Sequence, residues 1–194
     1  MTEKRYALLI IDMQNDFVLP EGPWRIKDAA KTVPVIRKLL DAFRKRKLPV
    51  FHIIRQYRED GSDVELPRKE GFLGGRKVAL AGTRGAEIVD ELKPSPGEYV
   101  IVKHRYSGFF MTELPLLLRR LSVDTVVVAG TQDHNCVRAT IYDAISYDYN
   151  VILLEDATSS QTQEIHEQNI RDMKNIGVNV ITSNEFMRNL RNSR

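Results

Sequence analysis

The sequence predicts an α/β fold in which an open parallel sheet is covered by helices on both faces. Continuously apolar segments, typical of strands buried on both faces, alternate with segments that repeat apolar residues every three or four positions. Strands separated by helices imply right-handed βαβ crossovers, which build a parallel sheet. The 194 residues, 42% of them hydrophobic, suffice for a substantial core, and we expect residues 1–194 to form one domain.

Six segments have the character of buried strands. Tyr6–Ile11 is continuously apolar and ends at Asp12, and Thr125–Ala129 has the strongest strand character and is followed by Gly130. The remaining predicted strands are Val50–Ile54, Tyr99–Val102, Val151–Leu154 and Val178–Ile181.

Helical spacing is clearest in Pro34–Lys47, which places apolar residues on one face and Lys and Arg on the other. The other predicted helices are Thr83–Leu92, Thr112–Leu121 with Thr112 as its N-cap, Cys136–Tyr147, Thr162–Asn175 and Glu185–Leu190. Residues 55–81 lack periodicity and are rich in Gly, Arg and Asp, so we interpret them as a long loop. Loops of more than about 15 residues in a compact domain are commonly functional or disordered.

Composition and charge exclude several classes of protein. A single cysteine excludes an intramolecular disulfide framework and any zinc or iron–sulfur site built from several cysteines. The net charge of +3 supports a nucleic-acid partner only weakly. The basic run Arg44–Lys47 falls at a predicted helix C-terminus, where cations complement the helix dipole. We therefore predict no nucleic-acid partner.

No segment approaches the about 18 consecutive apolar residues that a membrane span needs. The opening Met-Thr-Glu-Lys-Arg-Tyr lacks the layout of a signal peptide. We therefore expect a cytoplasmic protein that makes no contact with a membrane.

Three residues with complementary chemistry follow predicted strands. Asp12 follows the first strand, Lys103 follows the third, and Cys136 lies six residues after Gly130, where a helix is predicted to begin. The carboxyl ends of parallel strands meet at one edge of the sheet, and open α/β sheets bind ligands there. We therefore expect Asp12, Lys103 and Cys136 to lie close together.

This set of side chains suits attack on a carbonyl carbon. A helix N-terminus and a nearby cation favour the thiolate of a cysteine, and we expect Cys136 to have the first from its own helix and the second from Lys103. Asp12 can take up the thiol proton and return it to a leaving amine. Backbone N–H groups of the turn Gln132–Cys136 can form an oxyanion hole. Taken singly, the residues also fit structural roles, since free cysteines are commonly small buried hydrophobes and lysines are commonly surface charges.

Four stretches of the chain carry a family resemblance. They are Leu-Leu-Ile-Ile-Asp12-Met-Gln-Asn-Asp16-Phe17, Val-Ile-Val-Lys103-His-Arg-Tyr-Ser-Gly-Phe109, Val-Val-Val-Ala-Gly130-Thr-Gln-Asp-His-Asn-Cys136, and Leu-Glu-Asp156-Ala157-Thr158. In this order they resemble the opening, the lysine segment, the nucleophile segment and a later element of the isochorismatase-like cysteine hydrolases. The resemblance runs from about Tyr6 to Ile181.

The resemblance implies that Asp12, Lys103 and Cys136 are the catalytic triad of an amide-type C–N hydrolase. It implies a Rossmann-like three-layer α/β/α sandwich whose six parallel strands follow the order 3-2-1-4-5-6. It also implies a cis peptide bond between Thr131 and Gln132, which aims the Gln132 N–H at the oxyanion beside the N–H of Cys136.

The chain departs from some branches of this family. The family's nicotinamidases carry a metal site that begins with Asp-x-His after the second strand, whereas Val50-Phe51-His52 has no Asp before its histidine, and residues 53–82 contain no histidine. We therefore expect no metal ion and no cofactor. Isochorismate-cleaving members typically lack the cysteine, so Cys136 favours acyl transfer. The chain is most similar to the metal-free branch that includes N-carbamoylsarcosine amidases and ureidoacrylate amidohydrolases.

The long loop is expected to help cover the pocket. Arg55, Arg84 and Arg105 are candidates to bind a substrate carboxylate through a bidentate fork, although arginines are commonly surface charges. The aromatic candidates for the pocket walls are Phe17, Trp24, Tyr106 and Phe109, each of which could equally be a core residue. Gln14 and Asp16 could orient the loop that carries Asp12 or serve in turns.

The sequence thus predicts a cysteine-dependent hydrolase of a non-peptide C–N bond in a small amide, carbamoyl or ureido compound. The reaction would pass through an acyl-thioester and release ammonia or an amine. The alternatives are a nicotinamidase with the same triad and a non-catalytic small-molecule binding protein of the same fold. Because the family is commonly oligomeric, we expect a homo-oligomer, a dimer or tetramer, in which the 55–81 loop could complete a neighbour's pocket.

Overall fold

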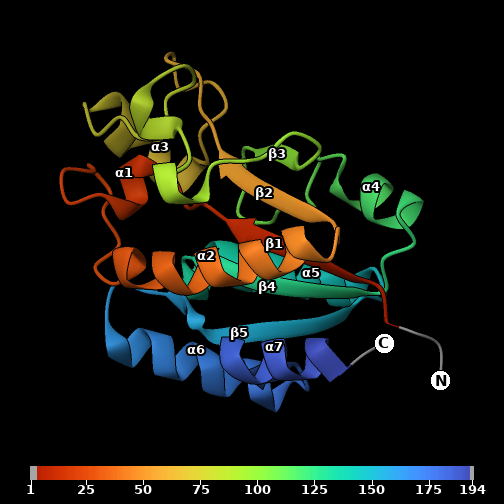
Figure 1. Ribbon diagram of the computed structural model, residues 1–194. Helices are drawn as coiled ribbons and strands as arrows, with labels where there is room; N and C mark the ends of the chain where they lie inside the picture. The colour runs from red at the N-terminus through yellow and green to blue at the C-terminus, as the bar shows by residue number, and fades with distance from the viewer. Residues whose placement is uncertain (1–3, 193–194) are drawn as a thin grey trace.

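A single six-stranded parallel sheet organises the computed structural model, which describes residues 4–192 (Figure 1). The strands lie in the order β3-β2-β1-β4-β5-β6, which confirms the predicted α/β/α class and strand order. Their bounds are β1 Tyr6–Ile11, β2 Val50–Arg55, β3 Tyr99–Lys103, β4 Thr125–Thr131, β5 Asn150–Ser159 and β6 Asn179–Ile181. All six lie at or close to the segments that the apolar runs predicted.

Helices cover both faces of the sheet, each over its own hydrophobic core. Leu8 and Ile10 of β1 face a core shared with α2 (Ala29–Lys45) and α7 (Ser183–Asn192). The alternate β1 residues face a second core, which is closed by α4 (Leu114–Arg120), α5 (Arg138–Ser146) and α6 (Gln163–Asn175). Because β1 and β4 are apolar on both faces, they form the centre of the sheet.

Two short helices lie beyond the carboxyl ends of the central strands. Figure 1 shows α1 (Asn15–Val18) and α3 (Leu66–Leu73) together at that end of the sheet. α3 lies inside the predicted loop of residues 55–81, so that prediction is wrong for this segment. Its only buried residue is Phe72, and a helix with so little apolar surface leaves no periodic signal in the sequence.

The predicted helix Thr83–Leu92 is also wrong. The chain instead forms two 3₁₀ turns, Arg84–Ala86 and Asp90–Leu92. Between them the backbone pairs with the segment after β1: the Asn15 N–H donates to the Glu87 carbonyl at 2.9 Å, and an isolated bridge joins Gln14 to Ile88. These tertiary contacts hold the backbone extended where the local pattern favours a helix.

Several helix boundaries differ from the prediction. α2 begins at Ala29 and contains Pro34 in its interior, so the proline does not mark its start. α4 begins at Leu114 with Glu113 at its N-cap, and the Thr112 hydroxyl still accepts a hydrogen bond from the Leu114 N–H at 3.3 Å. A π-helical turn, Asp133–Val137, precedes α5, so Cys136 lies in that turn rather than at the start of an α-helix.

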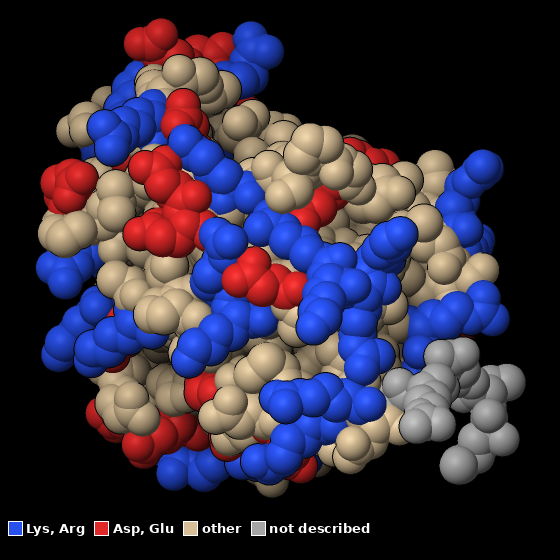
Figure 2. Space-filling model, in the orientation of Figure 1, with Lys and Arg blue, Asp and Glu red and all other residues tan. Residues whose placement is uncertain are grey.

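Charged side chains of both signs cover the face seen in Figure 2. The basic run at the end of α2 is partly engaged, since Arg44 donates to the Glu98 carboxylate at 2.6 Å and to the Lys93 carbonyl at 2.9 Å. Within residues 4–192, no helix is both long and apolar enough to cross a membrane.

The contact between β1 and β4 leaves no space for a side chain at Gly130. Gly130 is the register partner of Ile11 and has a φ of 115°. A Cβ atom at this position would lie 2.1 Å from the Ile11 carbonyl oxygen. Position 130 therefore requires glycine. The Ile11–Gly130 contact lies just before Asp12 on β1 and a few residues before Cys136 on β4.

We predict that Gly130→Ala lowers the free energy of unfolding by at least about 3 kcal/mol, because it adds a backbone clash to the left-handed strain. Urea unfolding followed by circular dichroism measures this loss. The control is Gly177→Ala, since Gly177 also has a positive φ, of 89°, but open space around it. It should lose only about 1–2 kcal/mol. Equal losses in the two variants would contradict the role assigned to the β1–β4 contact.

Candidate active site

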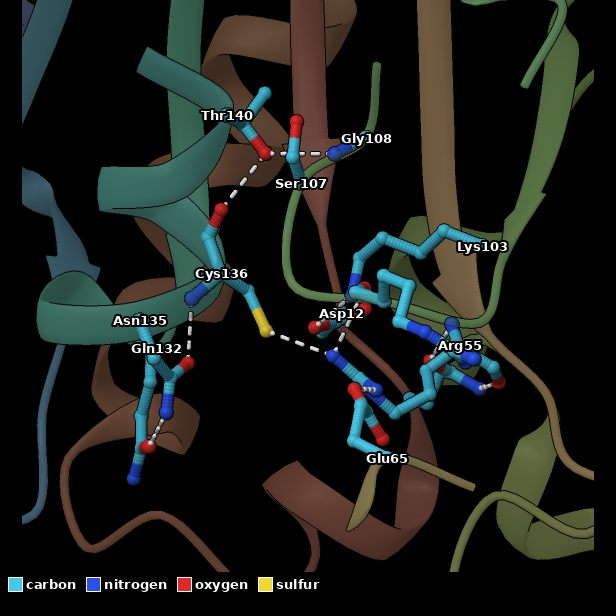
Figure 3. Close-up of polar contacts among 12 residues, drawn as sticks. Asp12, Arg55, Glu65, Lys103, Ser107, Gly108, Gln132, Asn135, Cys136 and Thr140 are labelled. Atoms are coloured by element: carbon cyan, nitrogen blue, oxygen red, sulfur yellow. Dashed lines mark hydrogen bonds and ion pairs between the residues drawn. The ribbon is translucent and has the colours of Figure 1, made fainter. Parts of the chain in front are cut away.

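The strand register brings the predicted site residues to one edge of the sheet. Lys103 ends β3 beside its register partner Arg55, which ends β2, and Asp12 directly follows β1. Cys136 lies in the π-helical turn after β4. The strand order reverses between β1 and β4, and this switch point is where open α/β sheets bind ligands. Figure 3 shows the four side chains converging there.

A buried ion pair joins Asp12 to Lys103. The Lys103 Nζ lies 2.8 Å from the Asp12 Oδ2, and the two residues are 0% and 3% exposed. Asp12 has a φ of 52°, in the left-handed region that aspartate tolerates better than most residues, and its N–H donates to the Ile53 carbonyl at 2.8 Å. The second carboxylate oxygen, Oδ1, is buried without a hydrogen-bond partner in the described structure. It is therefore free to accept a proton.

Cys136 is the free thiol of this edge, and hydrogen bonds reach both its side chain and its backbone. Its sulfur lies 3.2 Å from the Arg55 Nη2, and its carbonyl accepts from the Thr140 hydroxyl at 2.7 Å. Its N–H donates to the Asn135 side-chain oxygen, while the Asn135 amide donates to the Gln132 Oε1 at 2.7 Å. The peptide bond between Thr131 and Gln132 is cis.

Arg55 lies deep inside the site rather than at its mouth. It is 1% exposed. Its Nη1 donates to the Tyr57 hydroxyl and to the Glu65 Oε1, and its Nη2 donates to the Arg105 carbonyl at 3.1 Å as well as to Cys136. Burial lowers the pKa of Arg55, but the negative groups around it, led by Cys136 and Asp12, outweigh burial and raise that pKa well above its ordinary value. Arg55 is therefore a permanent buried cation.

Two residues of this network, Tyr57 and Glu65, were missed in the sequence. The Tyr57 hydroxyl donates to the Glu65 Oε2. Burial raises the pKa of Glu65, but the Arg55 charge and these hydrogen bonds outweigh burial and lower that pKa below its ordinary value. Glu65 lies directly before α3, which the sequence did not predict, so its approach to Arg55 left no signal in the local pattern.

The backbone of Arg55 is held by the buried side chain of Gln14. The Gln14 amide donates to the Arg55 carbonyl and to the Ala86 carbonyl, each at 2.7 Å, and accepts from the Arg55 N–H at 2.7 Å. Asp16 bonds elsewhere, accepting from the Ala79 N–H at 2.7 Å. Gln14 thus ties the end of β2 to the segment that follows Asp12.

A cavity of about 610 Å³ opens onto these groups. Asp12, Cys136 and Gln132 line this cavity, and so do the predicted wall residues Phe17 and Trp24. The cavity also has an arginine-rich wall, formed by Arg25, Arg55, Arg68 and Arg76.

The other predicted substrate-binding residues lie outside this lining. Arg84 and Arg105 are exposed, and the Arg105 guanidinium donates to the Asp63 carbonyl at 2.7 Å. Tyr106 lines an adjacent groove, and Phe109 is buried in the core that α4 and α5 share. Arg68 was missed because it lies on α3. Its guanidinium is 4.7 Å from the Trp24 ring centre and 4.8 Å from that of Tyr106.

The sequence comparison placed the nicotinamidase Asp-x-His motif against Val50-Phe51-His52, but these residues lie within β2 and not after it. Because β2 ends at Arg55, the segment to compare with Asp-x-His is Arg55-Gln56-Tyr57, which lacks both the aspartate and the histidine. His52 lies within β2 and bonds to the Glu98 carboxylate at 2.9 Å. Among residues 4–192, no three His, Cys, Asp or Glu side chains are grouped so that they could hold a metal ion.

An ion pair anchors the turn that carries Cys136. Asp133 is fully buried, and its Oδ2 lies 2.6 Å from the His166 Nδ1 on α6. The hydrogen bond to Asp133 raises the pKa of His166 above its ordinary value. The Asp133–His166 contact therefore ties the π-helical turn to α6, and the protonated form of His166 strengthens it.

This fold and site define a member of a known family. Residues 6–185 match the Isochorismatase domain. The chain therefore belongs to the isochorismatase family of hydrolases, as its motifs predicted.

Three similar proteins illustrate the range of this family. A protein of Arabidopsis thaliana described as a probable inactive nicotinamidase is 42% identical over 188 residues, which cover 95% of each chain. The crystal structure of an isochorismatase family protein from Desulfovibrio vulgaris has a TM-score of 0.93 and 46% identity, covering 96% of this chain and 98% of that one. N-carbamoylsarcosine amidase from Thermoplasma acidophilum has a TM-score of 0.78 and 34% identity, covering 92% and 96%.

We predict that the stabilisation from His166 depends on pH. Because the folded-state pKa is raised, the contribution is fully present below the unfolded value of about 6.5 and is lost as the pH rises through the folded value. Urea unfolding should show a larger loss of stability for His166→Gln at pH 6 than at pH 9. Asp133→Asn, which removes the largest of the influences that raise the His166 pKa, should reduce this pH dependence strongly, while Glu155 and Glu167 remain. A loss that is the same at both pH values would refute the charged pair.

Proposed function

We propose that this protein is a cysteine-dependent hydrolase of a non-peptide C–N bond in a small amide, carbamoyl or ureido compound. The observation that carries the proposal is the juxtaposition of a free thiol, a buried carboxylate–lysine pair and a cavity that opens onto both. Thiol, carboxylate and cation together supply the nucleophile, the proton carrier and the charge control that acyl transfer needs. The similarity to the structure of N-carbamoylsarcosine amidase supports hydrolysis of a C–N bond, since that protein is named as an amidase.

In the first half of the reaction, the Cys136 sulfur attacks the carbonyl carbon after its proton passes to Asp12. The new C–S bond places a negative charge on the carbonyl oxygen, and the N–H groups of Gln132 and Cys136 are proposed to bind it. The Cys136 N–H is engaged by the Asn135 side chain, so substrate binding must displace that contact. Lys103 holds the Asp12 carboxylate in place through its Oδ2, which leaves Oδ1 for the proton.

In the second half, the C–N bond breaks and Asp12 gives its proton to the departing nitrogen. Ammonia or an amine leaves, and the acyl group remains on Cys136 as a thioester. Asp12 then takes a proton from water, whose oxygen attacks the thioester carbon. The C–S bond breaks, the acid is released, and Asp12 returns its proton to the sulfur, which restores the thiol and the carboxylate for a new cycle.

The arginine-rich wall favours a substrate that carries a carboxylate. Asp12 is the cavity's acidic lining residue and is already paired with Lys103, and Arg55 is engaged in its own network. Arg68 is held between two aromatic rings and lies 3.9 Å from Glu65, beyond hydrogen-bond distance. We propose that Arg68 binds the substrate carboxylate, a role for which its planar fork is suited.

We predict that a screen of carbamoyl, ureido and carboxamide compounds for ammonia release will identify a substrate, and that Cys136→Ser will lower its turnover at least about a thousandfold, because the hydroxyl is a far weaker nucleophile in this setting. Cys136→Ala is the second control. Unchanged turnover in both variants would refute the proposed mechanism.

The screen also separates the alternatives. Ammonia release from nicotinamide, abolished by chelators, would favour a metal-dependent nicotinamidase. Specific binding of small amides without turnover would favour a binding protein. The Arabidopsis relative is described as a probable inactive nicotinamidase, so the screen must include this outcome.

We predict that Arg68→Met raises the KM of a carboxylate-bearing substrate by about 10- to 100-fold, the size expected for one lost charge-assisted fork, and changes kcat only a few-fold. A neutral amide of similar size should be affected little. The matched control is Arg58→Met, since Arg58 is an exposed arginine of the preceding loop. An equal rise in KM for neutral and anionic substrates would exclude carboxylate recognition by Arg68.

A further inference from the structure

We propose that Arg55 is a fourth catalytic residue, whose buried guanidinium stabilises the thiolate of Cys136 directly. This inference rests on the proposed function, because it takes Cys136 as the nucleophile. It adds to the triad a residue that the sequence pointed to only as a substrate anchor.

The Arg55 guanidinium is in direct contact with the thiol. Its Nη2 lies 3.2 Å from the Cys136 sulfur, a hydrogen-bond distance for a sulfur acceptor. Its remaining contacts, to Tyr57 and Glu65 through Nη1 and to the Arg105 carbonyl through Nη2, hold the planar group in place. A group fixed in this way need not reorganise when charge develops on the sulfur.

The charges around the thiol point to Arg55 as its cationic partner. Lys103 pairs with Asp12 at 2.8 Å, and Figure 3 shows the Arg55 guanidinium beside that pair, with one nitrogen directed at the sulfur. The two acids and two bases of the cluster, Asp12, Glu65, Lys103 and Arg55, balance one another. The Nη1 side of Arg55 faces Glu65 and its Nη2 side faces the sulfur. In a buried site of low dielectric, a cation in contact with sulfur favours the thiolate strongly.

Arg55 is not available to bind a substrate carboxylate. Four acceptors surround its guanidinium, and the residue is 1% exposed. A substrate carboxylate therefore finds no free pair of N–H groups there. Lysine could not replace it, because a single ammonium cannot reach acceptors on opposite sides in the way that the fork does. The network thus requires an arginine at the end of β2.

Glu65 and Tyr57 act as positioning residues for this cation. Both contact the Nη1 side, and the Tyr57 hydroxyl also donates to Glu65. Glu65 directly precedes α3, the helix that carries Arg68. The segment of Glu65 and α3 therefore positions Arg55, which contacts Cys136, and also carries Arg68, which is proposed to bind substrate.

The test measures the alkylation rate of Cys136 by iodoacetamide, which is unambiguous because the chain has a single cysteine. Removing Arg55 alone would leave the buried Glu65 carboxylate with only Arg68, 3.9 Å away, as a cationic partner and could prevent folding. The informative variant is therefore the double variant Arg55→Met/Glu65→Gln, compared with Glu65→Gln alone. Arg138→Met, which removes an arginine on α5 that pairs with Asp172, controls for the loss of one positive charge.

At pH 7, the double variant should be alkylated at least about tenfold more slowly than Glu65→Gln, because less thiolate is present. At pH 10, above the ordinary thiol pKa of about 8.5, the two rates should converge. Arg138→Met should retain the wild-type rate. With an identified substrate, kcat should fall about 100-fold with little change in KM.

Equal alkylation rates at pH 7 for the double variant and Glu65→Gln would overturn the proposal, as would a slower rate that persists at pH 10, which would indicate altered access to the thiol. Alkylation requires no substrate. A failure of the proposed hydrolysis would appear in the ammonia screen alone and is therefore distinguishable from a failure of this inference.

Discussion

The buried ion pair between Asp12 and Lys103 ties together the edge of the sheet on which the site is built. Its partners follow β1 and end β3, so the pair reaches across the end of β2, the strand between them. Two buried charges are tolerated only when they are paired. Removing one partner of such a pair lowers the free energy of unfolding by about 3–5 kcal/mol. The pair therefore fixes the relative positions of three strand ends and holds the carboxylate that faces the cavity.

The rest of the site follows from the same constraint. Arg55 ends the strand that the pair crosses, so a second cation is buried beside the first and needs its own acid, which Glu65 supplies from the segment before α3. The remaining donor of Arg55 meets the Cys136 sulfur, which β4 and its π-helical turn bring from the other side. Positive and negative side chains thus alternate from Lys103 and Asp12 to Arg55 and Glu65, and Arg55 also contacts the Cys136 sulfur.

The sequence predicted those parts of the molecule that depend on local pattern. β1 matched its apolar run from Tyr6 to Ile11, and the strand order followed from the family resemblance. Asp12, Lys103 and Cys136 could be placed at one edge because parallel strands end together. The roles of Glu65 and Arg68 could not be predicted, since α3 buries one residue and shows no periodicity. The burial of Arg55 also escaped prediction, because arginines are commonly exposed and only the contacts of distant segments reverse that expectation.

The central claim is that acyl transfer at this edge passes through a thioester on Cys136. Hydroxylamine tests this most directly, because it competes with water for a thioester and yields a hydroxamate or hydroxyurea. With an identified substrate, increasing hydroxylamine should divert product from the acid to the hydroxylamine adduct while ammonia release stays constant or rises, and Cys136→Ser should form neither product. Acid formation that continues undiminished, with no adduct, would contradict the account.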